Sequence, residues 1–123
     1  MKERIFGDLI IKHRKSAIFF EIGEGEYYDC IFRFTEHEFK EFTSYIEEIA
    51  NESWNNVTPK VADSMGTDYS EYYDKEFDNN GYLSIIENGL RIEGPYTTTG
   101  RLYKFNKAKI QSFIFDLRKK IGC

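Results

Sequence analysis

The sequence predicts a single α+β domain over residues 1–123, in which an antiparallel sheet is built from two strand meanders, each followed by an amphipathic helix. The length of 123 residues is near the common size of one domain. Hydrophobic residues make up 41% of the chain and include eleven Phe and nine Tyr, enough large side chains for one core. Short apolar runs separated by polar turns occur twice, and apolar residues at helical spacing follow them each time.

The first meander is expected between residues 4 and 34. Its strands are predicted at 6–12, 17–22 and 27–34. Thr35 and Glu38 then match a capping box, in which each side chain accepts a hydrogen bond from the backbone N–H of the other residue, so a helix begins there. The helix is expected to reach about residue 50, because one apolar stripe continues along it: Phe39, Phe42, Ile46 and Ile49.

The chain between the first helix and the second meander has two predicted parts. Residues 51–65 are expected to be irregular, with Trp54 either filling the core or anchoring a partner. Within residues 68–77, aromatic residues at helical spacing predict a second, short amphipathic helix: Tyr69, Tyr72, Tyr73 and Phe77.

The strands of the second meander are predicted at 82–87, 90–93 and 102–105. The first two are joined through Asn88 and Gly89, the dipeptide that best fits a two-residue type I′ hairpin. Residues 94–100 contain Gly, Pro and Thr and predict a loop. Asn106 is then expected to cap the last helix, which carries lysines in its final turn and Gly122 just past its end.

Two histidines are the candidates for acid–base chemistry. His13 lies in a predicted turn, where a nuclease-type site needs a second base folded against it, and His37 lies in the first turn of a helix. Both are expected to be surface residues, and Cys30 is expected to be a small buried residue. Because no GxSxG, P-loop, GxGxxG or HExxH pattern occurs, we predict no catalytic residue and no cofactor.

One pattern resembles a calcium loop, since residues 76–87 place side chains at its ligand spacing. Position 1 is Glu76 where Asp is usual, and Asn88 with Gly89 breaks the helix that must follow an EF-hand loop. A turn leading into a strand explains the same residues. The two cysteines form no CxxC pair, so we predict neither a metal site nor a disulfide framework.

The sequence also bears on where the protein works. No apolar run approaches the roughly 18 residues that a membrane helix needs. Residues 1–8 lack the apolar core of a secretory signal. We therefore expect a cytoplasmic protein that does not bind a membrane.

The formal net charge of −4 conceals an uneven distribution along the chain. Residues 1–20 carry a net charge of +3, residues 21–90 carry −13, and residues 91–123 carry +6. Unless folding mixes these segments, the domain is expected to present an acidic face and a basic face, and a field of one sign steers partners of the other sign.

The densest acidic stretch, residues 63–78, interleaves carboxylates with aromatic residues. Carboxylates pair with Arg and Lys, and aromatic side chains give rigid contact area, so such a stretch suits a basic protein surface. The alternative is an ordinary solvated helix whose tyrosines face the core. The predicted partner-binding residues are Asp63, Asp68, Tyr69, Glu71, Tyr72, Asp74, Glu76 and Asp78.

Nucleic acid is the competing partner, because the last part of the chain is basic: Arg101, Lys104, Lys107, Lys109, Arg118, Lys119 and Lys120. A nucleic-acid-binding domain usually has a basic total, whereas the pI here is about 5.3. Lysines in a final helical turn also complement the helix dipole. We therefore expect a protein partner rather than nucleic acid.

In size, acidity, aromatic content and α+β layout, the chain resembles the small immunity proteins that neutralise bacterial polymorphic and contact-dependent growth-inhibition toxins. The resemblance is one of general character and carries no residue roles. It implies a stoichiometric inhibitor that binds a cognate toxin domain, often a basic nuclease, with acids in place of substrate phosphates. Phage-encoded inhibitors of host nucleases share this profile.

Two further hypotheses stay open beside the inhibitor. One is a small hydrolase or nuclease that uses His13 with a carboxylate. The other is a structural domain that self-associates through an exposed strand edge.

Overall fold

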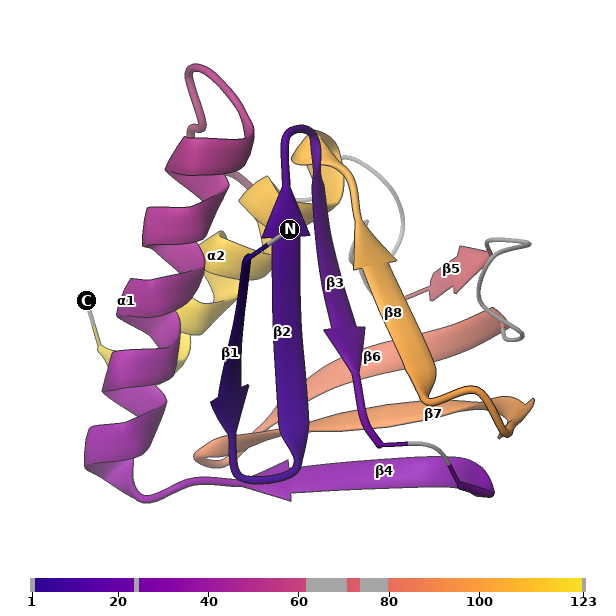
Figure 1. Ribbon diagram of the computed structural model, residues 1–123. Coiled ribbons are helices and arrows are strands. Elements are labelled where there is room, and N and C mark those ends of the chain that lie inside the picture. Colours follow the sequence, from indigo (N-terminus) through magenta and orange to yellow (C-terminus); the bar gives the residue numbers. More distant parts are fainter. Residues whose placement is uncertain (1, 24, 62–70, 74–79, 123) are drawn as a thin grey trace.

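The computed structural model describes residues 2–23, 25–61, 71–73 and 80–122. It has two antiparallel sheets and two helices, which confirms the predicted α+β class (Figure 1). None of the helices in these ranges is long and apolar enough to cross a membrane. The elements are β1 (Lys2–Phe6), β2 (Leu9–Arg14), β3 (Ala17–Glu21), β4 (Tyr27–Arg33), α1 (Glu36–Ser53), β5 (Glu71–Tyr73), β6 (Asn80–Ile86), β7 (Gly89–Thr97), β8 (Arg101–Phe105) and α2 (Lys107–Ile121).

The strands form two sheets where one was predicted. The first sheet has the order β1-β2-β3-β8, and the second sheet has the order β4-β7-β6-β5. Each meander therefore gives one strand to the other sheet: β4 pairs with β7, and β8 pairs with β3. Through this exchange both sheets turn one apolar face to a common core, so the two halves of the chain form one unit.

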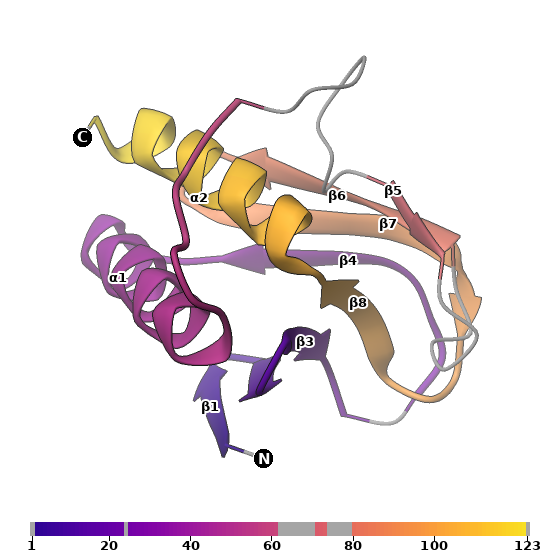
Figure 2. The same ribbon diagram turned by 90° about the horizontal axis from the view of Figure 1, so that it is seen from above.

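The helices lie on the inner side of the first sheet. α1 packs against β2 and β3, α2 packs against β8, and the two helices contact each other. Figure 1 shows the first sheet in front, with α1 along its left side and α2 behind it. Figure 2, the view from above, shows β5 and β6 in the upper part of the picture, away from β1 and β3 in the lower part. Neither α1 nor α2 therefore covers the outer face of the first sheet.

The core is aromatic and joins every layer. Phe20 of β3, Phe42 of α1 and Phe113 of α2 are each 0% exposed, and their rings contact one another at centroid distances of 5.9–6.4 Å. The second sheet adds Leu83, Leu90 and Ile92. Trp54, which follows α1, packs partly buried against this core, so it takes the first of its two predicted roles.

Both helix starts and the end of α2 confirm the sequence predictions. Thr35 and Glu38 form the capping box, with the Glu38 N–H donating to Thr35 Oγ1 at 3.1 Å and the Thr35 N–H donating to Glu38 Oε1 at 3.0 Å. The hydrogen bond from the Thr35 N–H, followed by one with the Thr35 side chain, holds the pKa of the Glu38 carboxyl below its usual value. Asn106 caps α2 by accepting from the Lys109 N–H at 2.8 Å. Gly122 ends α2 with a left-handed φ of 78°.

The predicted strand at 6–12 is wrong, because the chain reverses within it. Phe6 pairs with Leu9 across a two-residue turn in which Gly7 has a φ of 60°. Glycine reaches this conformation without a Cβ penalty, which allows β1 and β2 to form a hairpin here.

The short helix predicted at 68–77 is also wrong where the structure describes it. Glu71–Tyr73 is a strand, and Tyr72 pairs with Gly81 of β6. Aromatic residues favour strands as well as helix faces, and β6 supplies a partner that the local spacing cannot reveal. The remainder of the predicted helix lies outside the described residues.

The predicted hairpin at 88–89 exists with its turn one residue earlier. Ile86 pairs with Gly89, so Glu87 and Asn88 form the turn and Asn88 takes the positive φ of 49°. Gly89 is instead the first residue of β7, which continues to Thr97 through most of the predicted loop. A Cβ on Gly89 would overlap the carbonyl oxygen of Phe32, so glycine is required there by close packing.

Candidate binding surfaces

The predicted acidic and aromatic stretch falls mostly outside the described residues. This applies to Asp63, Asp68, Tyr69, Asp74, Glu76 and Asp78. Glu71 and Tyr72 belong to β5, which pairs with β6 and stands last in the strand order of the second sheet. The backbone thus places this part of the stretch at a sheet edge rather than on a helix.

Elsewhere, folding brings cations from both chain ends to the acids of the middle segment. The ion pairs are Lys2–Glu52, Arg4–Glu41, Lys12–Glu21, Arg91–Asp29 and Arg118–Glu47. In the described part of the chain, these ion pairs therefore neutralise several of the acids that were expected to form a separate acidic face. A count of charge along the sequence could not show this.

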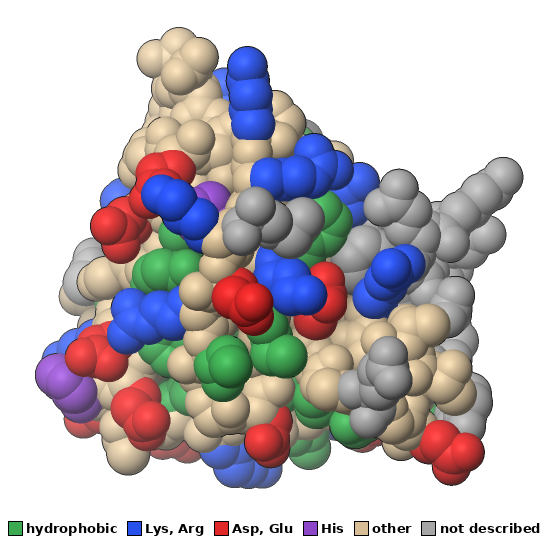
Figure 3. All heavy atoms as spheres, viewed as in Figure 1, with side chains coloured by type: hydrophobic (Ala, Val, Ile, Leu, Met, Phe, Trp, Pro, Cys, Tyr) green, Lys and Arg blue, Asp and Glu red, His purple; other side chains and the backbone are tan. Residues whose placement is uncertain are grey.

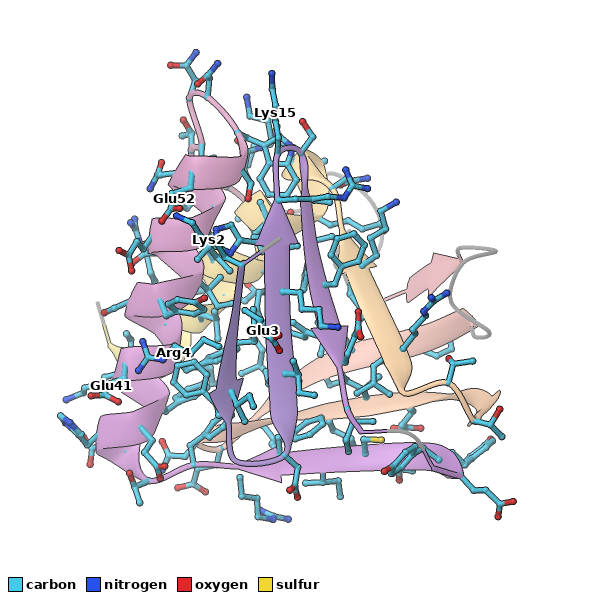
Figure 4. All side chains as sticks on the ribbon, viewed as in Figure 1. Lys2, Glu3, Arg4, Lys15, Glu41 and Glu52 are labelled. Carbon is cyan, nitrogen blue, oxygen red and sulfur yellow. The ribbon has the colours of Figure 1, made fainter. Side chains whose placement is uncertain are left out.

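Two of these pairs connect β1 to α1. Glu52 forms an ion pair with Lys2 at 3.6 Å and lies 3.3 Å from the His13 ring, and Glu41 lies 3.8 Å from Arg4. Figure 4 shows Lys2 and Arg4 extending from β1 toward Glu52 and Glu41 on α1. The Arg4 guanidinium also lies 4.5 Å from the centre of the Phe6 ring. These contacts hold the edge strand β1 beside the helix.

His13 differs most from its sequence-based prediction. It lies in strand β2 with its side chain directed inward, and it is 6% exposed. Its Nε2 is 3.3 Å from Glu52 Oε1, and its Nδ1 is buried with no hydrogen-bond partner among the described residues. A general base must reach a substrate, so this burial weighs against the proposed role in a hydrolase. The His37 side chain is 84% exposed, as predicted.

Cys30 is buried in β4, as predicted, with 7% of its surface exposed. Burial, together with the neighbouring Asp29 carboxylate, raises the pKa of its thiol. A raised pKa keeps the thiol protonated near neutral pH, and the protonated form is the less nucleophilic one.

The Glu52 contacts make a pH-dependent contribution to stability. The His13 hydrogen bond, followed by the charge of Lys2, holds the pKa of the Glu52 carboxyl below its ordinary value of 4.5. A carboxyl with a lowered pKa stabilises the fold above its unfolded-state pKa, and this contribution is lost as pH falls through the folded-state pKa. Glu52→Gln is therefore expected to be less stable than wild type near neutral pH, with the difference shrinking below about pH 4.5. Urea unfolding across this range measures it.

Glu48→Gln is the matched control for this prediction. Glu48 lies on the same helix, is exposed, and forms no ion pair with a described residue. Its substitution is expected to leave the difference from wild type independent of pH. A constant difference for Glu52→Gln across the same pH range would contradict the assignment.

The outer face of the first sheet is a surface that the sequence did not predict. Cross-strand pairs place Ile5 beside Ile10 at one end, and Arg14 beside Ala17 at the other. Phe19 stands between Lys12 and Lys104 in the register. Figure 3 shows cations gathered over the upper part of this face and hydrophobic side chains near its lower end. Cations from residues 1–20 and from β8 meet here, which requires the long-range pairing of β3 with β8.

The residues of the calcium-loop pattern that the structure describes do not form such a loop. β6 starts at Asn80 and continues through Ser84, so the ligand positions from Asn80 to Ser84 belong to a strand. Within the described ranges, no three His, Cys, Asp or Glu side chains are grouped so that they could hold a metal ion.

Comparison of the chain with known protein families, with curated proteins and with solved structures finds no match. The function of the protein must therefore be argued from its residues and their geometry alone.

Proposed function

We propose that this protein binds and neutralises another protein stoichiometrically in the cytoplasm, in the manner of the small bacterial immunity proteins. The partner is a basic domain, of the kind found in nuclease toxins. The observation that carries the proposal is the position of Glu71 and Tyr72 in an edge strand, within the stretch that holds the excess negative charge.

The charge balance supports a partner surface at this edge. Residues 63–78 contain six acids and one lysine, a net charge of −5, whereas the whole chain carries −4. The rest of the chain is therefore close to neutral, and many of its described acids are already paired with cations. An edge strand also offers backbone hydrogen bonds to an added strand, while carboxylates and aromatic side chains select a basic one.

Neutralising four acids of this stretch tests the proposal. The variant Asp68→Asn, Glu71→Gln, Asp74→Asn and Glu76→Gln is expected to associate more slowly with the protein recovered by pull-down. Its association rate is also expected to depend less on salt, because exposed charges steer the encounter. Stopped-flow or biosensor kinetics at several salt concentrations measure both effects.

The control changes the same number of charges elsewhere. Asp8, Glu26, Glu48 and Glu87 are exposed and form no ion pair with a described residue. Replacing these four by their amides is expected to change the rate only slightly. If the two variants slow association equally, total charge rather than this stretch governs binding. An unchanged rate in the first variant refutes the proposed surface.

A further inference from the structure

The outer face of the first sheet has three zones along its strands. The upper zone is basic and contains Arg14 and Lys15, and Lys104 adjoins it beside Phe19, in the register row of Lys12. Arg14 and Lys104 place their charged groups 5.5 Å and 5.7 Å from the centre of the Phe19 ring, so their positions are held by a rigid side chain. Figure 4 shows Lys15 at the tip of the β2–β3 hairpin. This zone offers fixed positive charge at the end of the sheet.

The middle zone carries both signs of charge. Lys12 lies beside Glu3 in the register and forms an ion pair with Glu21 at 3.1 Å. Carboxylates therefore lie next to the basic zone on the same face. They repel an anionic group placed directly over them, whereas a protein segment can place hydrogen-bond donors there and its carboxylates elsewhere.

The lower zone holds an apolar pair, and Glu21 follows beside Ile10 in the register. Ile5 and Ile10 are cross-strand neighbours, and Ile5 is 59% exposed, one of the largest exposures among the hydrophobic side chains that the structure describes. This pair forms contact area suited to an apolar side chain of a partner.

We propose that this face is a second docking surface, and that it binds an acidic protein segment which also carries apolar residues. Carboxylates of that segment lie over Arg14 and Lys15, and its apolar residues cover Ile5 and Ile10. β5 belongs to the second sheet and lies apart from this face (Figure 2), so this inference goes beyond the proposed inhibitor function and does not depend on it.

The same zones argue against the other anionic partners. A single-stranded nucleic acid binds by stacking bases on exposed aromatic rings, whereas Phe19 is 5% exposed. A phosphate backbone also has no apolar group to place against Ile5 and Ile10. An anionic membrane that contacts both the isoleucine pair and the basic zone also meets Glu21, which lies beside Ile10, and Glu3, which lies beside Lys12; these carboxylates oppose its binding. A protein segment can satisfy all three zones together.

Fluorescence anisotropy with labelled polymers tests the proposal on the full chain. A glutamate–tyrosine copolymer is expected to bind more tightly than polyglutamate, because it supplies carboxylates and apolar area together. Arg14→Gln with Lys15→Gln is expected to weaken binding of both polymers about three- to ten-fold, the combined size of two exposed charge contacts. Ile5→Ser is expected to remove the preference for the copolymer.

The matched control is Lys119→Gln with Lys120→Gln, which removes two exposed charges from α2, away from this face, and is expected to leave binding unchanged. Circular dichroism verifies that each variant is folded. Lys15→Gln alone repeats the binding test with a substitution in the β2–β3 turn, outside the strands. Three results overturn the proposal: no copolymer binding, binding equal in all variants, or tighter Arg14-dependent binding of a single-stranded oligonucleotide or of phosphatidylserine vesicles.

Discussion

Phe42→Ala is expected to lower the free energy of unfolding by about 3–5 kcal/mol, the range for deleting a fully buried phenyl ring. Phe42 is 0% exposed and lies where α1 meets the first sheet and α2. Its ring centroid is 5.4–6.4 Å from those of five other rings: Phe6, Phe20, Phe34, Phe39 and Phe113. The surrounding rings are rigid and belong to several different elements, so they cannot move in to fill the space left by the Phe42 ring. Most of the cavity is therefore expected to persist. Urea unfolding at neutral pH measures the loss.

An exposed position provides the comparison for Phe42. Ile5→Ala removes a hydrophobic side chain that is 59% exposed, and it is expected to change stability by no more than about 0.5 kcal/mol. Phe42→Leu keeps much of the buried volume and is expected to lose less than half of what Phe42→Ala loses. If Phe42→Ala and Ile5→Ala cost the same, the aromatic cluster is not the centre of the core.

The helices could be predicted because their signals are local. The Thr35 capping box, the Phe39 and Phe42 stripe and the Asn106 cap all act within one or two turns of chain. Strand partners depend on the whole molecule. Nothing near β4 in the sequence indicates that it pairs with β7 rather than with β3, because alternation specifies a face and not a neighbour.

The candidate surfaces could be predicted only in part for the same reason. Arg91 reaches Asp29 across 62 positions of sequence and binds it through two hydrogen bonds, at 2.9 and 3.2 Å. A sum of charges along the chain assigns such residues to separate segments, although folding joins them in one ion pair. The basic zone beside Phe19 likewise exists only because β8 returns to pair with β3. The sequence shows that acids are concentrated in residues 63–78, but it does not show which other residues folding brings next to them.

The position of the β6–β7 turn leads to the second large expected effect. Gly89→Ala is expected to destabilise the protein by about 3 kcal/mol, the upper part of the range for overpacking a close contact. The new methyl group would overlap the backbone carbonyl oxygen of Phe32, and a backbone atom paired in a sheet cannot move aside as a flexible side chain can. β7 must therefore move away from β4 at the point where Gly89 pairs with Arg33, and this distorts the second sheet. Thermal and urea unfolding both measure this loss.

Substitutions at Asn88 distinguish this explanation from the hairpin predicted by sequence. Asn88 holds the positive φ of 49°, so Asn88→Gly is expected to be nearly neutral, and Asn88→Ala is expected to cost about 1–2 kcal/mol of left-handed strain. If Gly89 served as a turn residue with positive φ, its replacement by Ala would cost a similar amount. A loss at Gly89→Ala clearly greater than that at Asn88→Ala therefore identifies packing against β4 as the reason for the glycine, and equal losses refute it.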